Sequence, residues 1–588
     1  CACKYPPHSA PEQSPRRPGE QVRSAERDGI QRRVVTARGI QRNSPMRCLT
    51  SAVLLGGCLS SSAVTPAQKR KAKYLAEREA FIELNSEVSG TYATLPLTPA
   101  EERVNSHLVS ERDAFVIDNT EASTFPPQQF FYEWQHRDDV LNSSVWSLLE
   151  SMPKGAALHL HTGSCGPTDW LISEGLSMDG AFVYWGEDQP DVCLSNLGGY
   201  PLACNSTSPN LTPLFKGTIM FYNESAAEGV APSGFRSVRA LRAAIPDFDA
   251  QLRALLVSDS TYEDMTSLQA WDNFMPIFSR VGGFHAYKPA FLAYMQESFR
   301  VLNDNHVQHA EIRATLGLNG FGALYDLDGA TYEGTEVVEA YQAALDLFRA
   351  SGDARAEDFS MRLIAATLRV LPVGAVEGDF EYAFQLKQAH PELVAGFDVV
   401  AEEDPNHATI DYLDVWMDIP KLEAKYGERM PLFFHDGESN DRNNTNLVDA
   451  VMLGCKRIGH GFNAYYYPLV REELKRQNIA LEVNPISNQI LRYVDDLQVH
   501  PASGYLAEGV PMVLSSDDPG VFGYEALTYD FYAATTAWLL DLRALKTLAF
   551  NSLRYSALPE DAKQIAIDSW RAQWVQWVDA VDQLVPKA

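Results

Sequence analysis

The sequence predicts an α/β protein whose main part is a (β/α)8 barrel, and two observations lead to this fold class. From residue 152 onward, eight short apolar runs typical of strands alternate with amphipathic or Ala-rich stretches typical of helices. Four of the eight runs have His or Asp at or next to their carboxyl ends, and barrels of this kind place functional residues there. An open doubly wound sheet is the alternative, but no Gly-rich phosphate turn follows the first run.

Composition supports a large packed protein and limits its partners. The 588 residues are 45% hydrophobic and 11% aromatic, which excludes a mainly disordered chain. The formal net charge of −28 argues against a nucleic acid polymer, because binding phosphates needs a basic surface.

Residues 1–45 differ from the rest, with nine Lys/Arg against four Asp/Glu and no apolar period. We interpret them as a disordered leader or non-native upstream sequence, the alternative being a functional basic arm.

Residues 46–63 are typical of a secretory signal peptide. Arg47 is followed by an apolar stretch, Leu49 to Leu59, and then by the small residues 60–63. The segment Leu55-Gly56-Gly57-Cys58 also resembles a lipoprotein cleavage box. No other segment reaches about 18 uninterrupted apolar residues, so we expect no transmembrane helix. A secreted, extracellular protein is expected.

Glycosylation sequons and two cysteines fit an exported chain. Cys193 and Cys204 flank a loop rich in Gly, Pro and Asn, and a disulfide closing that loop is expected in an oxidising compartment. Two unpaired thiols are the alternative. Five sequons offer acceptor asparagines, namely Asn142, Asn205, Asn210, Asn223 and Asn443.

Ahead of the barrel, residues 67–150 indicate a helical arm. Its expected helices are Ala67–Asn85, Pro99–Ile117 and Phe130–Leu149, with a Pro-containing break before the last. Such an arm packs on its own domain or on a second copy, and it suits a homodimer.

The barrel is expected over residues 152–580, with an inserted subdomain at about 165–265 that interrupts the first βα unit. The expected strands are Ala156–His161, Gln308–Thr315, Met361–Val370, Val394–Val400, Pro431–His435, Arg457–Phe462, Ala480–Pro485 and Pro511–Ser516. The expected helices are Phe284–Asp304, Thr335–Ala350, Phe380–His390, Ile410–Lys425, Asn446–Leu453 and Pro468–Arg476.

The residues at the strand ends predict a metal site. His159 and His161 end the first strand and share a face, because strand side chains alternate with period two. His435 ends the fifth strand, His460 the sixth, and Asp517-Asp518 follows the eighth. One such histidine is more often structural, but four placements in register are not expected by chance.

Imidazoles with one carboxylate suit Zn²⁺, and a position left for water makes such a site catalytic. The metal lowers the pKa of bound water toward about 7. Glu438, three residues after His435, is then placed to transfer protons as a general acid and base. An exposed loop glutamate is the alternative reading.

Four segments carry a resemblance to a known family. They are residues 152–161 (MPKGAALHLH), 457–462 (RIGHGF), 482–489 (EVNPISNQ) and 515–519 (SSDDP). They resemble adenosine deaminases, specifically the secreted adenosine deaminase-related growth factor branch, over roughly residues 67–580. The resemblance implies a secreted metal-dependent hydrolase of the amidohydrolase superfamily with a (β/α)8 barrel.

Carried over residue by residue, the resemblance implies one Zn²⁺ per chain, held by His159, His161, His435 and Asp517. His460 would orient the metal-bound hydroxide that attacks purine C6, and Glu438 would protonate ring N1 and assist the departure of ammonia. Asp518 would contact the N7 side of the purine. Trp271 resembles an aromatic residue that lies against the nucleoside, although a plain core Trp is nearly as common there.

Four positions depart from the family pattern, and all concern substrate contacts. Thr162 stands where an Asp usually serves the ribose, and Leu368 where this branch tends to have a sugar-contacting His. Ala401 replaces a usual Gly, which is tolerable only if φ stays negative. Asp436 replaces a usual Ala and should point away from His435 into an ion pair or cap. If Asp436 instead faces the site, it would raise the pKa of Glu438.

The first hypothesis is therefore a secreted zinc-dependent deaminase that converts adenosine, and deoxyadenosine, to inosine-type products and ammonia. The second is a related deaminase of another aminopurine or of AMP. The third is a growth-factor-like protein that binds a cell-surface receptor and whose catalysis is secondary.

Overall fold

The computed structural model describes residues 65–88, 96–121, 137–195, 202–203, 211–223, 233–258, 265–317, 321–353 and 355–585. These residues fall into two compact units divided between Ile82 and Glu83. The expected leader (1–45) and signal peptide (46–63) lie outside the described residues. In the described part of the chain, no helix combines the length and the apolar character that a membrane span needs.

Eight parallel strands form the centre of the larger unit, in two four-stranded sheets ordered β1-β8-β11-β12 and β13-β14-β15-β16. The strands are β1 Gly155–His161, β8 Val307–Ala314, β11 Ser360–Leu368, β12 Val394–Val400, β13 His435–Asp436, β14 Arg457–His460, β15 Ala480–Val483 and β16 Met512–Leu514.

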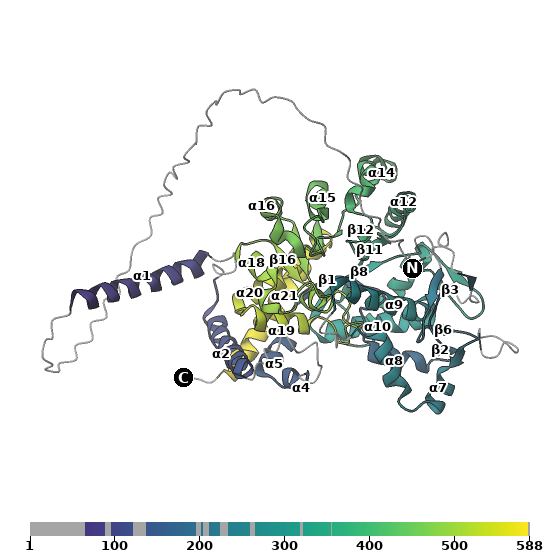
Figure 1. Cartoon of the computed structure of the whole chain (residues 1–588), viewed down its shortest axis with the longest axis horizontal. Helices are drawn as coiled ribbons and strands as arrows, with labels where there is room; N and C mark the ends of the chain where they lie inside the picture. The colour runs from purple at the N-terminus through teal and green to yellow at the C-terminus, as the bar shows by residue number, and fades with distance from the viewer. Residues whose placement is uncertain are drawn as a thin grey trace, which may run out of the picture. The chain divides into compact units, whose positions relative to one another are not determined.

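Parallel bridges at both junctions close the two sheets into a barrel. Phe397 of β12 pairs with Leu432 just before β13, and Leu160 of β1 pairs with Asp517 just after β16. Every residue of β12, β14, β15 and β16 is buried, as expected for strands enclosed by helices. Figure 1 shows β1, β8 and β11 in the interior, with α12, α15 and α16 at the periphery. The (β/α)8 barrel predicted from the sequence is confirmed.

The predicted strand Pro431–His435 is shorter in the structure, where β13 contains only His435 and Asp436. The preceding residues still follow β12, because the amide of Phe433 donates to the carbonyl of Phe397 at 2.9 Å.

Helices cover the barrel and follow most of its strands. They are α9 Ser267–Ala286, α10 Lys288–Asp304, α11 Thr335–Arg349, α12 Val373–Ala389, α13 Leu413–Met417, α14 Ile419–Tyr426, α15 Asn446–Leu453, α16 Pro468–Gln477, α17 Pro485–Ile490, α18 Pro501–Ala507, α19 Thr528–Ala537, α20 Leu542–Arg554 and α21 Glu560–Leu584. Short 3₁₀ turns are η4 Thr409–Tyr412, η5 Phe462–Tyr466 and η6 Leu497–Val499.

Two predicted helices are each divided in the structure. The stretch Phe284–Asp304 contains the end of α9 and the whole of α10, and Ile410–Lys425 is divided among η4, α13 and α14. Pro289 explains the start of α10 and Pro420 the start of α14, because each lies in the first turn of a new helix, where the missing N–H costs nothing.

The arm and the segment between β1 and β8 complete the described chain. The arm contains α1 Pro66–Val88, α2 Pro99–Glu121, α4 Arg137–Leu141 and α5 Ser144–Glu150. Between β1 and α9 lie α6 Thr168–Ser173, η2 Gly175–Ser177, β2 Ala181–Tyr184, β3 Gln189–Ser195, β4 Leu202–Ala203, β5 Leu211–Leu214, β6 Ile219–Phe221, β7 Phe235–Ser237, α7 Val238–Ala244 and α8 Phe248–Leu256. These strands pair antiparallel in the orders β6-β2-β7 and β4-β3-β5, and a further ribbon joins β9 Leu324–Tyr325 to β10 Thr331–Tyr332.

Candidate active site

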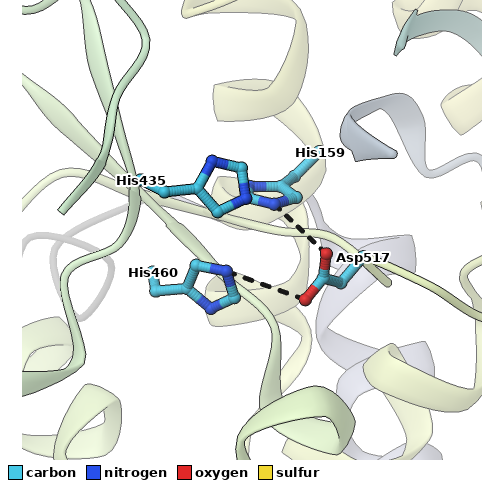
Figure 2. A group of neighbouring side chains, drawn as sticks. All are labelled: His159, His435, His460 and Asp517. Carbon is cyan, nitrogen blue, oxygen red and sulfur yellow. Dashed lines mark ion pairs between the residues drawn. The ribbon is translucent and has the colours of Figure 1, made fainter. Parts of the chain in front are cut away.

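Histidines from three strands meet at the carboxyl ends of the barrel strands. The ring of His159 lies 4.4 Å from that of His435 and 4.8 Å from that of His460, centroid to centroid. His161 follows two residues after His159 and lies 5.3 Å from its ring. Figure 2 shows His159, His435 and His460 around the carboxylate of Asp517.

Two carboxylates, one on β15 and one on β12, orient two of these rings. Nδ1 of His159 donates to Glu482 at 2.7 Å, and Nδ1 of His435 donates to Asp398 at 2.7 Å. With the proton fixed on Nδ1, each ring presents the lone pair of Nε2. Nε2 of His159 is buried without a hydrogen-bond partner among the described residues and lies 3.3 Å from Oδ1 of Asp517.

The resulting donor set fits a metal ion. One ligand atom from each of His159, His435, His460 and Asp517 lies within 4.8 Å of the others, and His161 forms a second such group with Asp517 and Asp518. Burial lowers the pKa of His435 to about 3, so its imidazole is neutral. Burial opposes the ionisation of Asp517, yet the adjacent His159 and His161 hold its pKa well below the usual range. The neutral imidazole of His435 and the ionised carboxylate of Asp517 match the protonation states that a metal requires.

His460 lies in a different environment from the other two rings. The side-chain amides of Asn484 and Asn488 lie 3.4 and 3.3 Å from its Nδ1, where they donate to it. An Nδ1 that accepts leaves the proton on Nε2, which lies 3.7 Å from Asp517. A protonated Nε2 donates a hydrogen bond and does not bind a metal, so this environment favours His460 as a donor beside the ligands.

Glu438 is buried 3.4 Å from Nδ1 of His460. Burial, the charge of Asp517 and the charge of Glu403 raise its pKa well above the usual range, which favours its protonated form. Its backbone amide donates to Glu403 at 2.6 Å, which fixes the turn after β13. Burial and Asp517 also raise the pKa of Asp518 to about 7, while the Ser164 hydroxyl donates to its carboxylate.

A cavity of about 340 Å³ opens next to these groups and is mostly apolar. Trp271, Thr162, Leu368 and Ala401 all line it together with His161, His435, His460, Glu438, Asp517 and Asp518. The indole N–H of Trp271 donates to the Tyr493 hydroxyl at 2.8 Å. Trp271 is thus both buried and part of the cavity wall.

Thr162 and Leu368, the two positions expected to face a sugar, offer little polarity. The Thr162 hydroxyl lies 2.6 Å from the Tyr341 hydroxyl and 3.1 Å from the carbonyl of Arg313, so it is already engaged. Leu368 adds only apolar surface.

One expectation is wrong. Ala401 was expected to keep a negative φ, but its φ is +88°. The chain turns sharply at the end of β12 to reach Glu403, whose carboxylate holds the turn that carries Glu438. Ala therefore occupies a conformation that glycine adopts without cost.

Asp436 points away from the cavity, as side-chain alternation predicts. It is buried and forms an ion pair with Arg369 at 2.7 Å, and it accepts from the Thr409 hydroxyl at 2.6 Å. This is the ion pair behind the strand, and Asp436 does not line the cavity.

The cysteines and sequons are partly described. Cys193 is disulfide-bonded, while its predicted partner Cys204 lies outside the described residues, as do Asn205 and Asn210. Asn142 and Asn443 are exposed and Asn223 is partly buried. The pairing and the glycosylation stay predictions.

Sequence reasoning assigned no role to the groups behind the histidines. Asp398, Glu482 and Arg313 are all buried within strands or at strand ends. The sequence feature that could have revealed them is a charged residue inside an otherwise apolar run, because burying a charge costs free energy unless it is paired.

Comparison with known proteins gives the family of this chain. A family model for adenosine deaminase matches residues 250–572. Adenosine deaminase 2 from Sus scrofa is 31% identical over 90% of this chain and 97% of its own length, and that from Homo sapiens is 30% identical over 85% and 93%. Among solved structures, adenine deaminase from Arthrobacter aurescens matches with a TM-score of 0.46 and 19% identity, over 72% of this chain and 99% of its own. The chain belongs to the adenosine deaminase family and is an enzyme of the hydrolytic deaminase class.

Proposed function

We propose that the protein is a secreted, zinc-dependent adenosine deaminase that hydrolyses adenosine, and deoxyadenosine, at purine C6 to release ammonia. The observation that carries the proposal is the pair of carboxylate-oriented rings, His159 and His435, whose ligand atoms gather with that of Asp517 beside the buried Glu438. The relatives named adenosine deaminase support the same reaction.

His159, His161, His435 and Asp517 would hold the single zinc ion. When bound, zinc supplies the Lewis acidity that makes water nucleophilic near neutral pH. The buried, neutral state of His435 and the ionised state of Asp517 support this assignment.

The proton steps then fall to the chain's own residues. Glu438, whose protonated form burial favours, donates to ring N1 as water adds to C6. The N–H at Nε2 of His460 stabilises the oxygen that becomes bonded to C6. Asp518 contacts the N7 side of the ring. Of the two protons that the added water gives up, one leaves with the amino group as ammonia and the other restores the proton of Glu438, so that C6 becomes a carbonyl and N1 keeps its hydrogen.

The cavity favours a nucleoside over a nucleotide. C6 and N9 lie at opposite ends of a purine, so a base that reacts beside Glu438 directs its N9 substituent toward the apolar part of the cavity. Arg313 is the one Lys or Arg among the described lining residues, and its guanidinium is engaged by Asp398 and Glu482. A phosphate would find no free cation among these residues.

A substrate panel tests the proposal. Purified protein, with its metal content measured, is assayed for ammonia release from adenosine, deoxyadenosine, AMP and adenine. Because Thr162 and Leu368 offer the sugar little, we expect kcat/KM for adenosine and deoxyadenosine to agree within about tenfold and to exceed that for AMP. Absence of ammonia from every compound in the panel would refute the assignment.

Glu438→Gln removes the proposed acid and should lower kcat by about 10²- to 10⁴-fold at unchanged metal content. Glu402→Gln is the matched control. Burial and two neighbouring carboxylates raise the pKa of Glu402 to about 7, yet this residue does not line the cavity. Equal losses in the two variants would contradict the role of Glu438.

Export and dimerisation belong to the same proposal. The disulfide at Cys193 and the exposed Asn142 and Asn443 support passage through an oxidising, glycosylating compartment. We propose cleavage of residues 46–63, an arm at 67–150 that pairs two copies, and a barrel with its insertion over 152–580. Recovery of a glycosidase-sensitive dimer from the medium of expressing cells is the expected result.

A further inference from the structure

Arg313 occupies a central position beneath the histidines. It lies on β8, its side chain is completely buried, and its guanidinium bridges two carboxylates. Nε donates to Oδ2 of Asp398 at 2.8 Å, and Nη2 donates to Oε2 of Glu482 at 2.6 Å. The remaining donors reach the carbonyls of Leu158 at 2.9 Å and Phe433 at 3.2 Å.

The same two oxygen atoms hold the two histidines. Oδ2 of Asp398 also accepts from Nδ1 of His435, and Oε2 of Glu482 also accepts from Nδ1 of His159. One planar cation therefore connects both rings through two short, buried chains of hydrogen bonds. Leu158 and Phe433 lie within two residues of these histidines, so Arg313 also holds the backbone that carries them.

We propose that Arg313 is the positioning residue that sets His159 and His435 relative to each other for metal binding, an inference that rests on the zinc site proposed above. Arg313 does so because a guanidinium donates in two fixed directions at once and stays charged when buried. A lysine ammonium can neutralise one carboxylate but cannot reproduce this planar fork.

Arg457 provides a matched control. It is equally buried, donates to the other oxygen of Glu482 at 2.6 Å, and pairs with Glu311 at 2.6 Å. In the described structure it makes no hydrogen bond or ion pair with Asp398. Arg313→Lys and Arg457→Lys therefore bury the same new group beside the same glutamate, but only the first breaks the bridge.

The experiment measures metal binding by the full chain. Zinc affinity is determined by chelator competition for the wild type, Arg313→Lys and Arg457→Lys, and the visible spectrum of the Co²⁺-loaded forms reports the ligand arrangement. We expect Arg313→Lys to lose about 10- to 100-fold in zinc affinity and to shift the Co²⁺ bands, the loss typical of groups that orient metal ligands. Arg457→Lys should change affinity by less than about threefold and leave the bands in place.

A second pair of variants covers the case in which Arg313→Lys does not fold. Asp398→Asn and Glu482→Gln preserve side-chain volume, and each interrupts one chain of hydrogen bonds. If Arg313 joins the two chains, the loss of zinc affinity in the double variant is smaller than the product of the single losses.

The outcomes separate the two claims. A wild type that binds neither zinc nor Co²⁺ overturns the metal site. A wild type that binds zinc while Arg313→Lys keeps its affinity, or loses no more than Arg457→Lys, overturns the role of Arg313 alone. Multiplicative losses in the Asp398 and Glu482 variants overturn it as well.

Discussion

Ala401 stores backbone strain at the wall of the cavity. Its φ of +88° costs a non-glycine residue about 1–3 kcal/mol, and His460 and Asp517 of the same cavity also have positive φ, at 60° and 62°. Three such residues around one cavity are typical of a functional site held in shape by its surroundings. Strand periodicity was enough to predict which residues lie at the strand ends. Their φ angles were not, because these follow from how each strand turns into its loop.

Relief of this strain is measurable. Ala401→Gly should raise the free energy of unfolding by up to about 1 kcal/mol, since glycine adopts positive φ readily but loses more backbone entropy on folding. Ala366→Gly in β11 is the control, because this buried alanine does not have a positive φ and should lose about 1 kcal/mol. Urea denaturation of both variants gives the comparison, and equal losses would contradict strain at Ala401.

At the scale of elements, β13 is the shortest barrel strand and depends on a contact across the sheet. Arg369, just after β11, passes over β12 to reach Asp436 at 2.7 Å and also donates to the His435 carbonyl and, at 3.2 Å, to the Thr409 hydroxyl. The sequence predicted an ion pair or cap for Asp436, because alternation turns it from the face of His435. It could not name Arg369, because the two are 67 residues apart and on strands that are not neighbours.

Breaking this pair should destabilise the protein strongly. Asp436→Ala leaves the buried Arg369 guanidinium without its carboxylate, which typically costs about 3–5 kcal/mol. The double variant Asp436→Ala/Arg369→Met removes both charges and should lose less than the single variant. The free energy of unfolding of both single variants, Asp436→Ala and Arg369→Met, and of the double variant is measured by chemical denaturation. A double variant whose loss of stability equals the sum of two large single losses would argue against a paired charge.

At the scale of the whole molecule, the barrel could be predicted because eight apolar runs repeat along the chain and closure leaves few alternatives. The chain of ion pairs inside the barrel could not be predicted from the sequence. Glu311, Arg457, Glu482, Arg313 and Asp398 form one continuous, buried chain of ion pairs drawn from four strands. Each is anomalous alone in an apolar strand and becomes favourable only beside its partners, which the order of strands around the barrel supplies.

A histidine outside the metal cluster, His500, makes stability depend on pH, and among the described residues it reaches His460 only through the side chain of Asn488. His500, at the start of α18, is fully buried between the rings of Phe462 and Trp538, and burial lowers its pKa to about 3. The unfolded chain takes up that proton near pH 6.5, so below this pH it binds more protons than the folded protein. The stability that the neutral ring contributes is therefore complete above pH 6.5 and is lost as the pH falls toward 3.

A single variant isolates this contribution from groups that titrate in the opposite sense. Glu402 and Asp518, whose pKa values burial raises to about 7, favour the folded state as the pH falls. The change of the wild-type free energy of unfolding with pH therefore mixes opposite contributions.

His500→Gln keeps those groups and removes one proton site. At pH 7.5 it loses the ring packing, the hydrogen bond from the Ala502 amide and the hydrogen bond that Nε2 donates to Oδ1 of Asn488. At pH 5 the wild type has itself lost about 2 kcal/mol of stability through His500. This pH lies about 1.5 units below the pKa of an unfolded histidine, and each unit corresponds to about 1.4 kcal/mol. The cost of the substitution should therefore be about 2 kcal/mol smaller at pH 5 than at pH 7.5, as measured by urea denaturation at both values. An equal cost at the two pH values would mean that His500 is protonated in the folded protein, against its burial.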